Sequence, residues 1–512
     1  MTKKLTYILT AFAFFASAIN AAAQPRPAGI FDDHTQVGNK RSVANLMYDP
    51  EYQTYGINAA GKNIWATEDD FHFAWKKLTG DFILRANANF FGDSKQLHRK
   101  LGWMVRSSLA GNSAHVSAVV HGGDGLTSLQ YRKVTGDSTK EIKAAISFAS
   151  VIQLERKGDT YTVSVARDGE TFTAVEVSNI DLGDEVYAGL FVCSHDEKVR
   201  ETALFTNVRI IRPAASDPVN SKKYIGSQIE LLTIDGGNSR VVYQSPKSLQ
   251  APNWMKDSKS LIYNSEGLLY NFNLKTHTQV QINTGSYTDN NNDHVISFDG
   301  KMLVISDHSK SFHESLGYVV PVTGGEPKRI TEKGSSYMHG WSPDGKYVVY
   351  AGERDHEFDV YRVAVAGGPE ERLTTAPGLD DGPEYTPDGK YIWFNSVRTG
   401  NMQIWRMKAD GTEQTQMTDD KDLYNWFPHI SPDGKWVVFL SFMKNEVKPS
   451  EHSFYKRVYL KLMPAAGGPS KVIAYVYGGQ GTINTPSWSP DSKRIAFISN
   501  NQLIYPVFPV SK

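Results

Sequence analysis

The chain has 512 residues, a length typical of roughly two to four domains. Hydrophobic residues make up 40% and charged residues 21%, and 55 basic residues balance 55 acidic ones, so the chain is globular and lacks the basic excess of a nucleic-acid-binding protein. A single cysteine excludes intramolecular disulfides and cysteine-ligated zinc or iron–sulfur sites.

Residues 1–23 have the pattern of a secretory signal peptide. Basic Lys3-Lys4 precedes the apolar stretch Leu5–Ile19, and Ala21–Ala23 offers a cleavage site. The alternative is an uncleaved membrane anchor, but the stretch is short for a span, so we expect export and a periplasmic or secreted mature chain without a transmembrane segment. Cys193 lies far from the cleavage site, so we do not expect a lipoprotein.

From residue 29 to residue 213 the sequence consists of short strand-like runs separated by glycine turns. In Phe71–Trp75 three aromatic side chains recur at a period of two, the spacing of a half-buried β-strand. Further expected strands are 81–90, 103–107, 115–120, 129–132, 161–166 and 187–193. No long amphipathic helix is evident. The pattern predicts an all-β sandwich of jelly-roll type.

Four segments of this half resemble the concanavalin-A-like, laminin-G-like sandwiches that bacteria attach to secreted proteins. The segments are 69–73, 78–82, 102–106 and 187–190. The resemblance spans most of residues 30–212 and implies a β-sandwich. For function it implies either glycan binding or packing against a neighbouring domain.

A different pattern begins at about residue 216, where one short turn recurs six times. Its aspartates are Asp257, Asp299, Asp344, Asp388, Asp433 and Asp491, spaced by 42, 45, 44, 45 and 58 residues. A repeat of this length made of strands is typical of propeller blades. Residues 216–512 are therefore predicted to form a six-bladed β-propeller.

Each repeat contains the strands of one blade. In Ser342–Gly345, proline fixes φ at the second position of the turn, and glycine eases the backbone at the fourth. An apolar strand follows the turn. Residues 229–243 supply only the outer part of a blade, whereas residues 487–510 lack a clear outer strand. We expect these two ends to complete one blade together and close the ring. The last interval holds an insertion around residues 443–457.

The Ser-Pro-Asp-Gly-Lys turns, each followed by an apolar strand, resemble the WD40-like PD40 repeats of the periplasmic TolB family. The resemblance covers about 290 residues and implies a propeller fold. Members of that family carry a small α/β domain before the propeller and serve the Tol–Pal envelope system. In this chain a sandwich stands in place of that domain.

Candidate functional residues lie just before each turn, because the innermost strand of every blade lines the central channel. Three channel histidines, His294, His339 and His429, could hold a divalent metal ion. The channel could also bind a uronic sugar, with an arginine on its carboxylate and His339, His429 or Glu384 as the catalytic group. The predicted ligand-binding residues are His294, His339, Arg354, Asp381, Glu384, Arg398, Trp426, His429 and Gln480.

Three functions remain open. The chain lacks a nucleophile elbow, a P-loop and an H-E-x-x-H motif, which favours a binding protein for a glycan or an envelope protein. An alternative is a lyase or hydrolase acting on an acidic saccharide; secreted oligogalacturonide lyases use propellers of similar architecture with a channel metal. The third is an envelope scaffold similar to TolB. Channel residues can also be polar simply because a channel holds water. A divalent metal ion is the one cofactor that the pattern suggests.

Overall fold

The computed structural model describes residues 28–38, 44–92, 96–215, 225–235, 237–308 and 314–503. The predicted signal peptide lies outside the described residues. These ranges contain 38 strands and no helix, which confirms the all-β fold. A search of the same ranges finds no helix long and apolar enough to span a membrane. The described chain divides into two compact units, residues 28–168 with 172–210, and residues 169–171 with 211–503.

The first unit consists of two antiparallel sheets. One has the order β1-β5-β14-β7-β8-β9-β10, with β4 paired to β5, and the other has the order β13-β12-β11-β6-β15-β3-β2. The first sheet contains β1 (Asp33–Val37), β4 (Asn63–Trp65), β5 (Glu68–Thr79), β7 (Lys100–Arg106), β8 (His115–His121), β9 (Thr127–Arg132), β10 (Lys140–Lys143) and β14 (Glu185–Cys193). The second contains β2 (Asn45–Asp49), β3 (Thr54–Gly61), β6 (Phe82–Phe91), β11 (Val151–Lys157), β12 (Thr160–Ala166), β13 (Thr173–Val177) and β15 (Asp196–Ile211).

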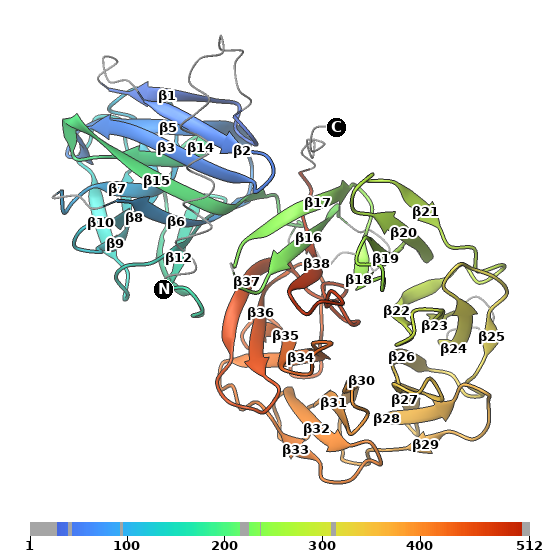
Figure 1. The fold of residues 1–512 in the computed structure, drawn as a ribbon. Coiled ribbons are helices and arrows are strands. Elements are labelled where there is room, and N and C mark those ends of the chain that lie inside the picture. Colours follow the sequence, from blue (N-terminus) through green and yellow to red (C-terminus); the bar gives the residue numbers. More distant parts are fainter. Residues whose placement is uncertain are drawn as a thin grey trace. The chain divides into compact units, whose positions relative to one another are not determined.

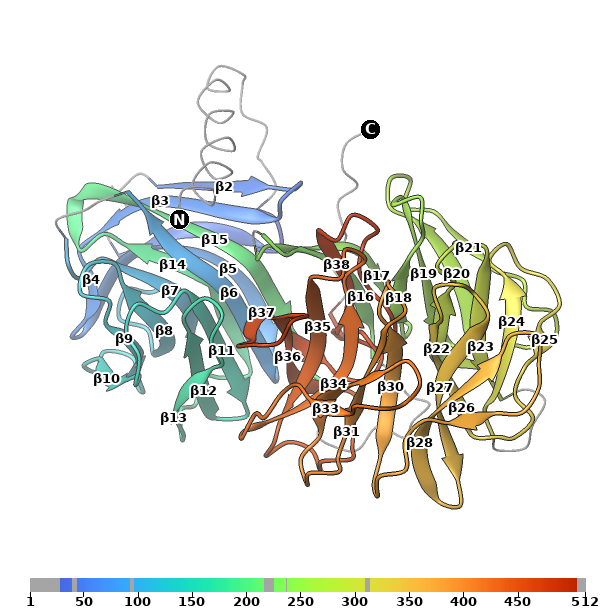
Figure 2. The same ribbon diagram turned by 60° about the horizontal axis from the view of Figure 1, so that its bottom comes forward.

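The two sheets pack face to face, with β5 and β14 against β3 and with β7 against β6 and β11 (Figure 2). The alternating aromatics of β5 behave as expected, since Phe71 and Phe73 are fully buried and Trp75 packs against the same cluster. Cys193 is buried and free. The jelly-roll and concanavalin-A-like assignments stay predictions.

A buried ion-pair network crosses the first sheet. Asp69 in β5 accepts hydrogen bonds from both terminal nitrogens of Arg132, at 2.8 and 2.9 Å. The Arg106 guanidinium lies 3.4 Å from the same carboxylate. Burial raises the pKa of Asp69, although both arginines oppose this shift. The buried carboxylate therefore depends on its arginine partners to remain ionised.

The second unit is a ring of six sheets, the predicted six-bladed propeller (Figure 1). Five sheets have four strands each, in sequence order from the innermost strand outward. The inner strands are β18 (Gln250–Trp254), β22 (Asn290–Ile296), β26 (Ser336–Trp341), β30 (Asp380–Tyr385) and β34 (Leu423–Ile430). The others are β19 (Ser260–Ser265), β20 (Leu268–Asn273), β21 (Gln279–Gln281), β23 (Met302–Asp307), β24 (Leu316–Pro321), β25 (Lys328–Arg329), β27 (Tyr347–Arg354), β28 (Glu357–Ala364), β29 (Glu371–Arg372), β31 (Tyr391–Ser396), β32 (Gln403–Lys408), β33 (Thr415–Gln416), β35 (Trp436–Met443), β36 (Lys456–Pro464) and β37 (Lys471–Gly478).

The sixth blade closes the ring with strands from both ends of the propeller segment. β16 (Ser227–Thr233) pairs on one side with β17 (Ser239–Ser245) and on the other with β38 (Arg494–Asn500). A bridge between Trp488 and Ile495 adds a short innermost piece. The start of the propeller segment therefore supplies the two outer strands of this blade, β16 and β17. The end of the segment supplies the inner part, β38 and the Trp488 bridge, as the prediction of a shared blade requires.

The repeated turn is built by local hydrogen bonds. The Ser342 hydroxyl donates to Asp344 at 2.6 Å and accepts from the backbone amide of Tyr347 at 2.9 Å. Gly345 takes a φ of 71°, in the left-handed region where glycine is favoured. The same serine–aspartate bond recurs at Ser431. The motif thus holds the hairpin between the first and second strands of a blade, which explains why it marks the fold.

Candidate functional site

The inner strands of the blades carry register shifts beside the predicted channel residues. The pairing of β26 with β27 skips His339, between Met338 and Gly340. β22, β30 and β34 shift in the same way, before His294, after Asp381 and before His429 respectively. A bulge adds a residue that does not pair and redirects the neighbouring side chains. These bulges give the channel side chains their directions.

Five segments of the propeller bring acidic, imidazole and amide groups together in what we call the channel cluster, comprising Asp293, His339, Asp381, His452 and Asn484. His339 Nε2 lies 3.2 Å from Asp381 Oδ1 and 3.9 Å from Asp293 Oδ1. The side-chain amide of Asn484 donates to Asp293 Oδ1 at 2.9 Å. The three charged side chains at its centre belong to β22, β26 and β30, so three blades meet at His339.

His452 joins the channel cluster from the insertion between β35 and β36, which we call the insertion loop (residues 444–455). Its ring packs against Trp426 and Phe427, with centroids 4.6 and 5.4 Å away. Phe427 also stacks on His339, at 6.0 Å. His452 Nδ1 and Asn484 Oδ1 are buried atoms without a hydrogen-bond partner among the described residues. The channel cluster therefore retains polar atoms that a bound group could satisfy.

The surroundings separate the pKa values of the two carboxyl groups. Burial raises the pKa of Asp293 to about 6, with His339 opposing the shift. Burial also acts to raise the pKa of Asp381, but the hydrogen bond and charge of His339 outweigh it and lower that pKa. Desolvation lowers the pKa of His339, yet Asp293 and Asp381 together raise it overall. The surroundings of this pair therefore favour the charged forms of both His339 and Asp381.

Glu384 and His429 form a separate, closed pair. His429 Nδ1 lies 2.7 Å from Glu384 Oε2, and its Nε2 contacts the backbone carbonyl of Ile483. The other oxygen of Glu384 accepts the amide of Ile430 at 3.1 Å. Both ring nitrogens of His429 are thus engaged, and a metal-binding or catalytic role for it would require breaking one of these contacts.

The three histidines predicted as metal ligands do not meet at one point. His294 is fully buried, and burial lowers its pKa to about 4. His339 and His429 belong to the different groups described above. Among the described residues, the one group of three or more potential ligands with atoms within 4.8 Å of one another is made of other side chains.

The two arginines predicted to face a ligand are held within their own blades. Arg354 makes two hydrogen bonds to Glu370, at 2.8 and 2.6 Å. Arg398 donates to Asp380 at 2.6 Å.

The remaining two predicted residues lie at the edge of the channel cluster. Trp426 has no exposed surface and packs in the core. Gln480 is half-buried, and its backbone amide donates to the backbone carbonyl of Ser453 in the insertion loop at 3.1 Å.

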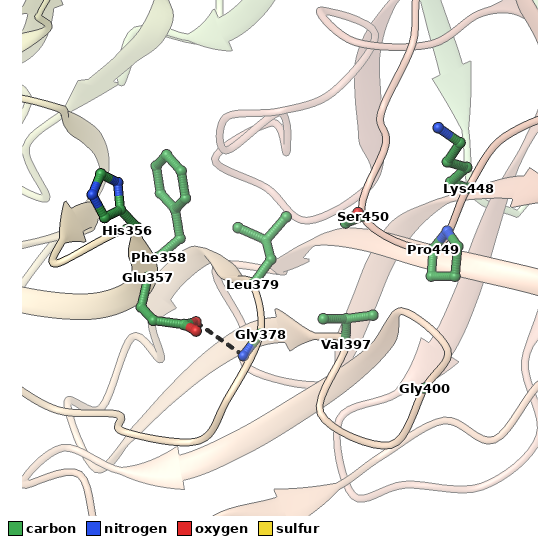
Figure 3. Close-up of a pocket in the computed structure, with 10 residues that line it drawn as sticks. All are labelled: His356, Glu357, Phe358, Gly378, Leu379, Val397, Gly400, Lys448, Pro449 and Ser450. Carbon is green, nitrogen blue, oxygen red and sulfur yellow. Dashed lines mark hydrogen bonds between the residues drawn. The ribbon is translucent and has the colours of Figure 1, made fainter.

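A pocket of about 500 Å³ that the sequence did not indicate lies on the three neighbouring blades that begin with β26, β30 and β34 (Figure 3). Its lining residues are His356, Glu357, Phe358, Gly378, Leu379, Val397, Gly400, Lys448, Pro449 and Ser450. The insertion loop supplies the last three. Leu379 stands two residues before Asp381 and Ser450 two residues before His452, so the pocket and the channel cluster are built from the same two segments. In the sequence, only the long last interval between the repeated turns pointed to the insertion loop that lines this pocket.

Comparison with known proteins places the propeller in a family. The family profile described as the TolB beta propeller domain matches residues 332–458. An uncharacterized protein of Agrobacterium fabrum is 45% identical over 273 residues, which are 53% of this chain and 92% of that protein. The chain belongs to the TolB-like PD40 propeller family.

One solved structure agrees with this family assignment. A proposed TolB from Agrobacterium tumefaciens is 44% identical to this TolB-like chain, covers 55% of it and 100% of its own length, and has a TM-score of 0.52. An oligogalacturonate lyase from Vibrio parahaemolyticus covers 54% of this chain and 98% of its own, at 13% identity and a TM-score of 0.35. That likeness is too low to support an argument about activity.

Proposed function

We propose that this chain is an exported binding protein whose propeller recognises an envelope partner on the face that carries the insertion loop. The observation that carries the proposal is the continuity of the pocket and the channel cluster. Leu379 and Ser450 line the pocket, and the same two segments continue to Asp381 and His452. A partner seated in the pocket would therefore lie beside a buried, charged group.

The pocket favours a protein segment over a glycan. Phe358, Leu379, Val397 and Pro449 are half-buried apolar side chains in its lining, whereas polar His356 and Lys448 stand at opposite ends in Figure 3. Concave sites with an apolar floor and few polar groups suit an apolar side chain of a peptide. The groups expected to hold an acidic sugar, Arg354, Arg398 and Trp426, are engaged elsewhere or buried, as described above.

The location of the protein in the cell envelope follows from the signal-peptide pattern of residues 1–23. Within this proposal, residues 29–213 form a concanavalin-A-like sandwich that adds a second recognition surface, and residues 216–512 form the propeller. Two stacked sheets in the first unit support the sandwich. Binding of the full chain to a glycan array, unaffected by changes in the propeller pocket, would assign glycan recognition to the sandwich.

A photoreactive amino acid at Ser450 tests the pocket in cells. The control position is Lys346, which lies at the turn between β26 and β27 and hence at the opposite end of the blade strands from the loop that holds Ser450. We expect a discrete crosslinked protein from position 450, lost when Val397→Asp places a charge in the pocket. Equal crosslinking from position 346, or a crosslink that survives Val397→Asp, would contradict the proposal.

A second candidate, a lyase or hydrolase acting on an acidic saccharide, is favoured by one observation. Asp293 and Asp381 flank His339, and their pKa values are displaced in opposite directions, a pattern of paired acids and bases in enzymes. An ultraviolet-absorbing unsaturated product from uronate oligomers, absent with His339→Ala, would support a lyase. Release of reducing ends without that product would indicate hydrolysis. If neither product forms, both the lyase and the hydrolase activity are excluded.

A further inference from the structure

Three loops of the first unit meet at one edge of its first sheet. β7 pairs with both β14 and β8, and the register aligns Cys193, Lys100 and His121 in one row. Because the strands are antiparallel, the start of β7 lies beside the ends of β8 and β14. His98 precedes that row by two residues and His195 follows it by two. The register alone therefore gathers three histidines at one edge.

An aspartate from the turn between β8 and β9 completes the group. Asp124 Oδ2 lies 3.2 Å from His98 Nδ1, and its Oδ1 lies 3.1 Å from His121 Nδ1. One ligand atom from each of these residues lies within 4.8 Å of the others. Ligands at 2.0–2.1 Å in a tetrahedral zinc site stand about 3.3 Å apart. The spacing of the group thus matches that of ligands around one small cation.

His195 lies beside this group of three as a ring neighbour of His98. Its ring centroid lies 5.5 Å from that of His98, and the His98 and His121 centroids are 5.4 Å apart. His121 is 6% exposed, and its Nε2 and the Nδ1 of His195 are buried without a hydrogen-bond partner among the described residues. Buried imidazole nitrogens of this kind usually have a partner.

The loops are held in place before anything binds. The amides of Gly122 and Gly123 donate to the carbonyls of Arg99 and Leu97, at 2.8 and 3.0 Å. A Cβ at Gly123 would lie 2.4 Å from the Cα of Leu97, so only glycine permits this approach. The Asp124 carboxylate is further oriented by the amide of Leu126, at 3.0 Å. Preorganised ligands of this kind are a condition for a specific metal site.

A fixed ammonium group, that of Lys100, stands in the same register row as His121. The Lys100 ammonium is fixed by Asn63 Oδ1 and the Ile64 carbonyl, both at 3.0 Å. Neutral imidazole with a carboxylate is the ligand set of zinc and neighbouring divalent metals.

We propose that His98, His121, Asp124 and His195 form a binding site for a divalent transition metal of the zinc class at the edge of the first unit. The site is separate from the channel histidines and does not depend on the proposed function. Because the ligands come from three loops, a bound ion would tie the loops together and stabilise the unit.

The test uses the full-length chain after dialysis against a chelator. Titration with Zn²⁺ by calorimetry and with Co²⁺ by visible absorption should show one equivalent bound at this site, and Zn²⁺ should raise the temperature of thermal unfolding. His98 has a side-chain exposure of 54%, so His98→Ala should fold normally while weakening binding by more than about tenfold, as even outer-shell changes do at metal sites. His195→Gln should act in the same direction.

The matched control is His277→Ala, which removes a partly exposed histidine of the propeller outside the pocket and should leave the titration unchanged. His339→Ala reports on the channel, because a metal bound there would persist in His98→Ala and vanish in His339→Ala. The proposal is overturned when the wild-type chain binds no Zn²⁺ at micromolar concentration. It is equally overturned when both His98→Ala and His195→Gln bind as the wild type does.

Discussion

Replacing Asp293 by asparagine should stabilise the propeller at neutral pH. Burial raises the pKa of Asp293 to about 6 from 3.8. The folded protein then binds the proton more tightly, so the contribution of this group to stability is complete below about pH 4 and is lost as the pH rises through about 6. A difference of about 2 pH units corresponds to about 3 kcal/mol. Asparagine carries no charge and can still accept the hydrogen bond of Asn484.

Denaturant unfolding at several pH values between about 4 and 8 measures this difference. Relative to wild type, the free energy of unfolding of Asp293→Asn should grow with pH and level off above about pH 6. The estimate of about 3 kcal/mol already includes the opposing attraction of His339, because that attraction is part of the shift to about 6. Asp419→Asn, at an exposed carboxylate paired with Lys421, is the control. A difference that stays constant or shrinks as the pH rises would refute the reasoning.

Three further substitutions test buried contacts inside the units, two in the first unit and one in the propeller, and denaturant unfolding measures each effect. Arg132→Met should cost about 3–5 kcal/mol, since it leaves Asp69 buried with its main partner removed, and a smaller loss would show that water reaches the carboxylate. Gly189→Ala should destabilise the first sheet, because its Cβ would meet the carbonyl oxygen of Ala74 at 1.9 Å; an unchanged transition would mean that the strands can separate there. Asn395→Ala should cost about 1–3 kcal/mol, because it removes the acceptor of a buried backbone amide in the β34 bulge, and wild-type stability would show that the bulge does not need this bond.

The propeller could be predicted because its signals are local. Each turn is fixed by bonds within five residues, such as those of Ser342, so the motif carries its own geometry. The incomplete ends of the repeat array, residues 229–243 and 487–510, likewise implied a shared blade. The sheet pairing of β16 with β38 then followed from the need to leave no strand edge open.

The site was predicted only in part, because its geometry depends on long-range partners. Arg354 and Arg398 were placed near the channel, but carboxylates 16 and 18 residues away hold both. The bulges that turn His339 inward depend on sheet register, which a strand's own sequence does not specify. The role of His452 depends on the path of the insertion loop. The cluster of His98 and Asp124 was missed because no ligand spacing in the sequence resembles a known metal motif.

The shared blade also determines when the nascent chain can complete its propeller during synthesis. Residues 227 and 500 become neighbours across β16 and β38, although 273 positions separate the side chains of Ser227 and Asn500. At a synthesis rate of about 5–20 residues per second, β16 waits roughly 15–50 s on the ribosome for its second partner. During that interval the unpaired N–H and C=O groups along one edge of β16 can pair with a strand of another chain. A chain that stalls before β38 would therefore be prone to aggregate.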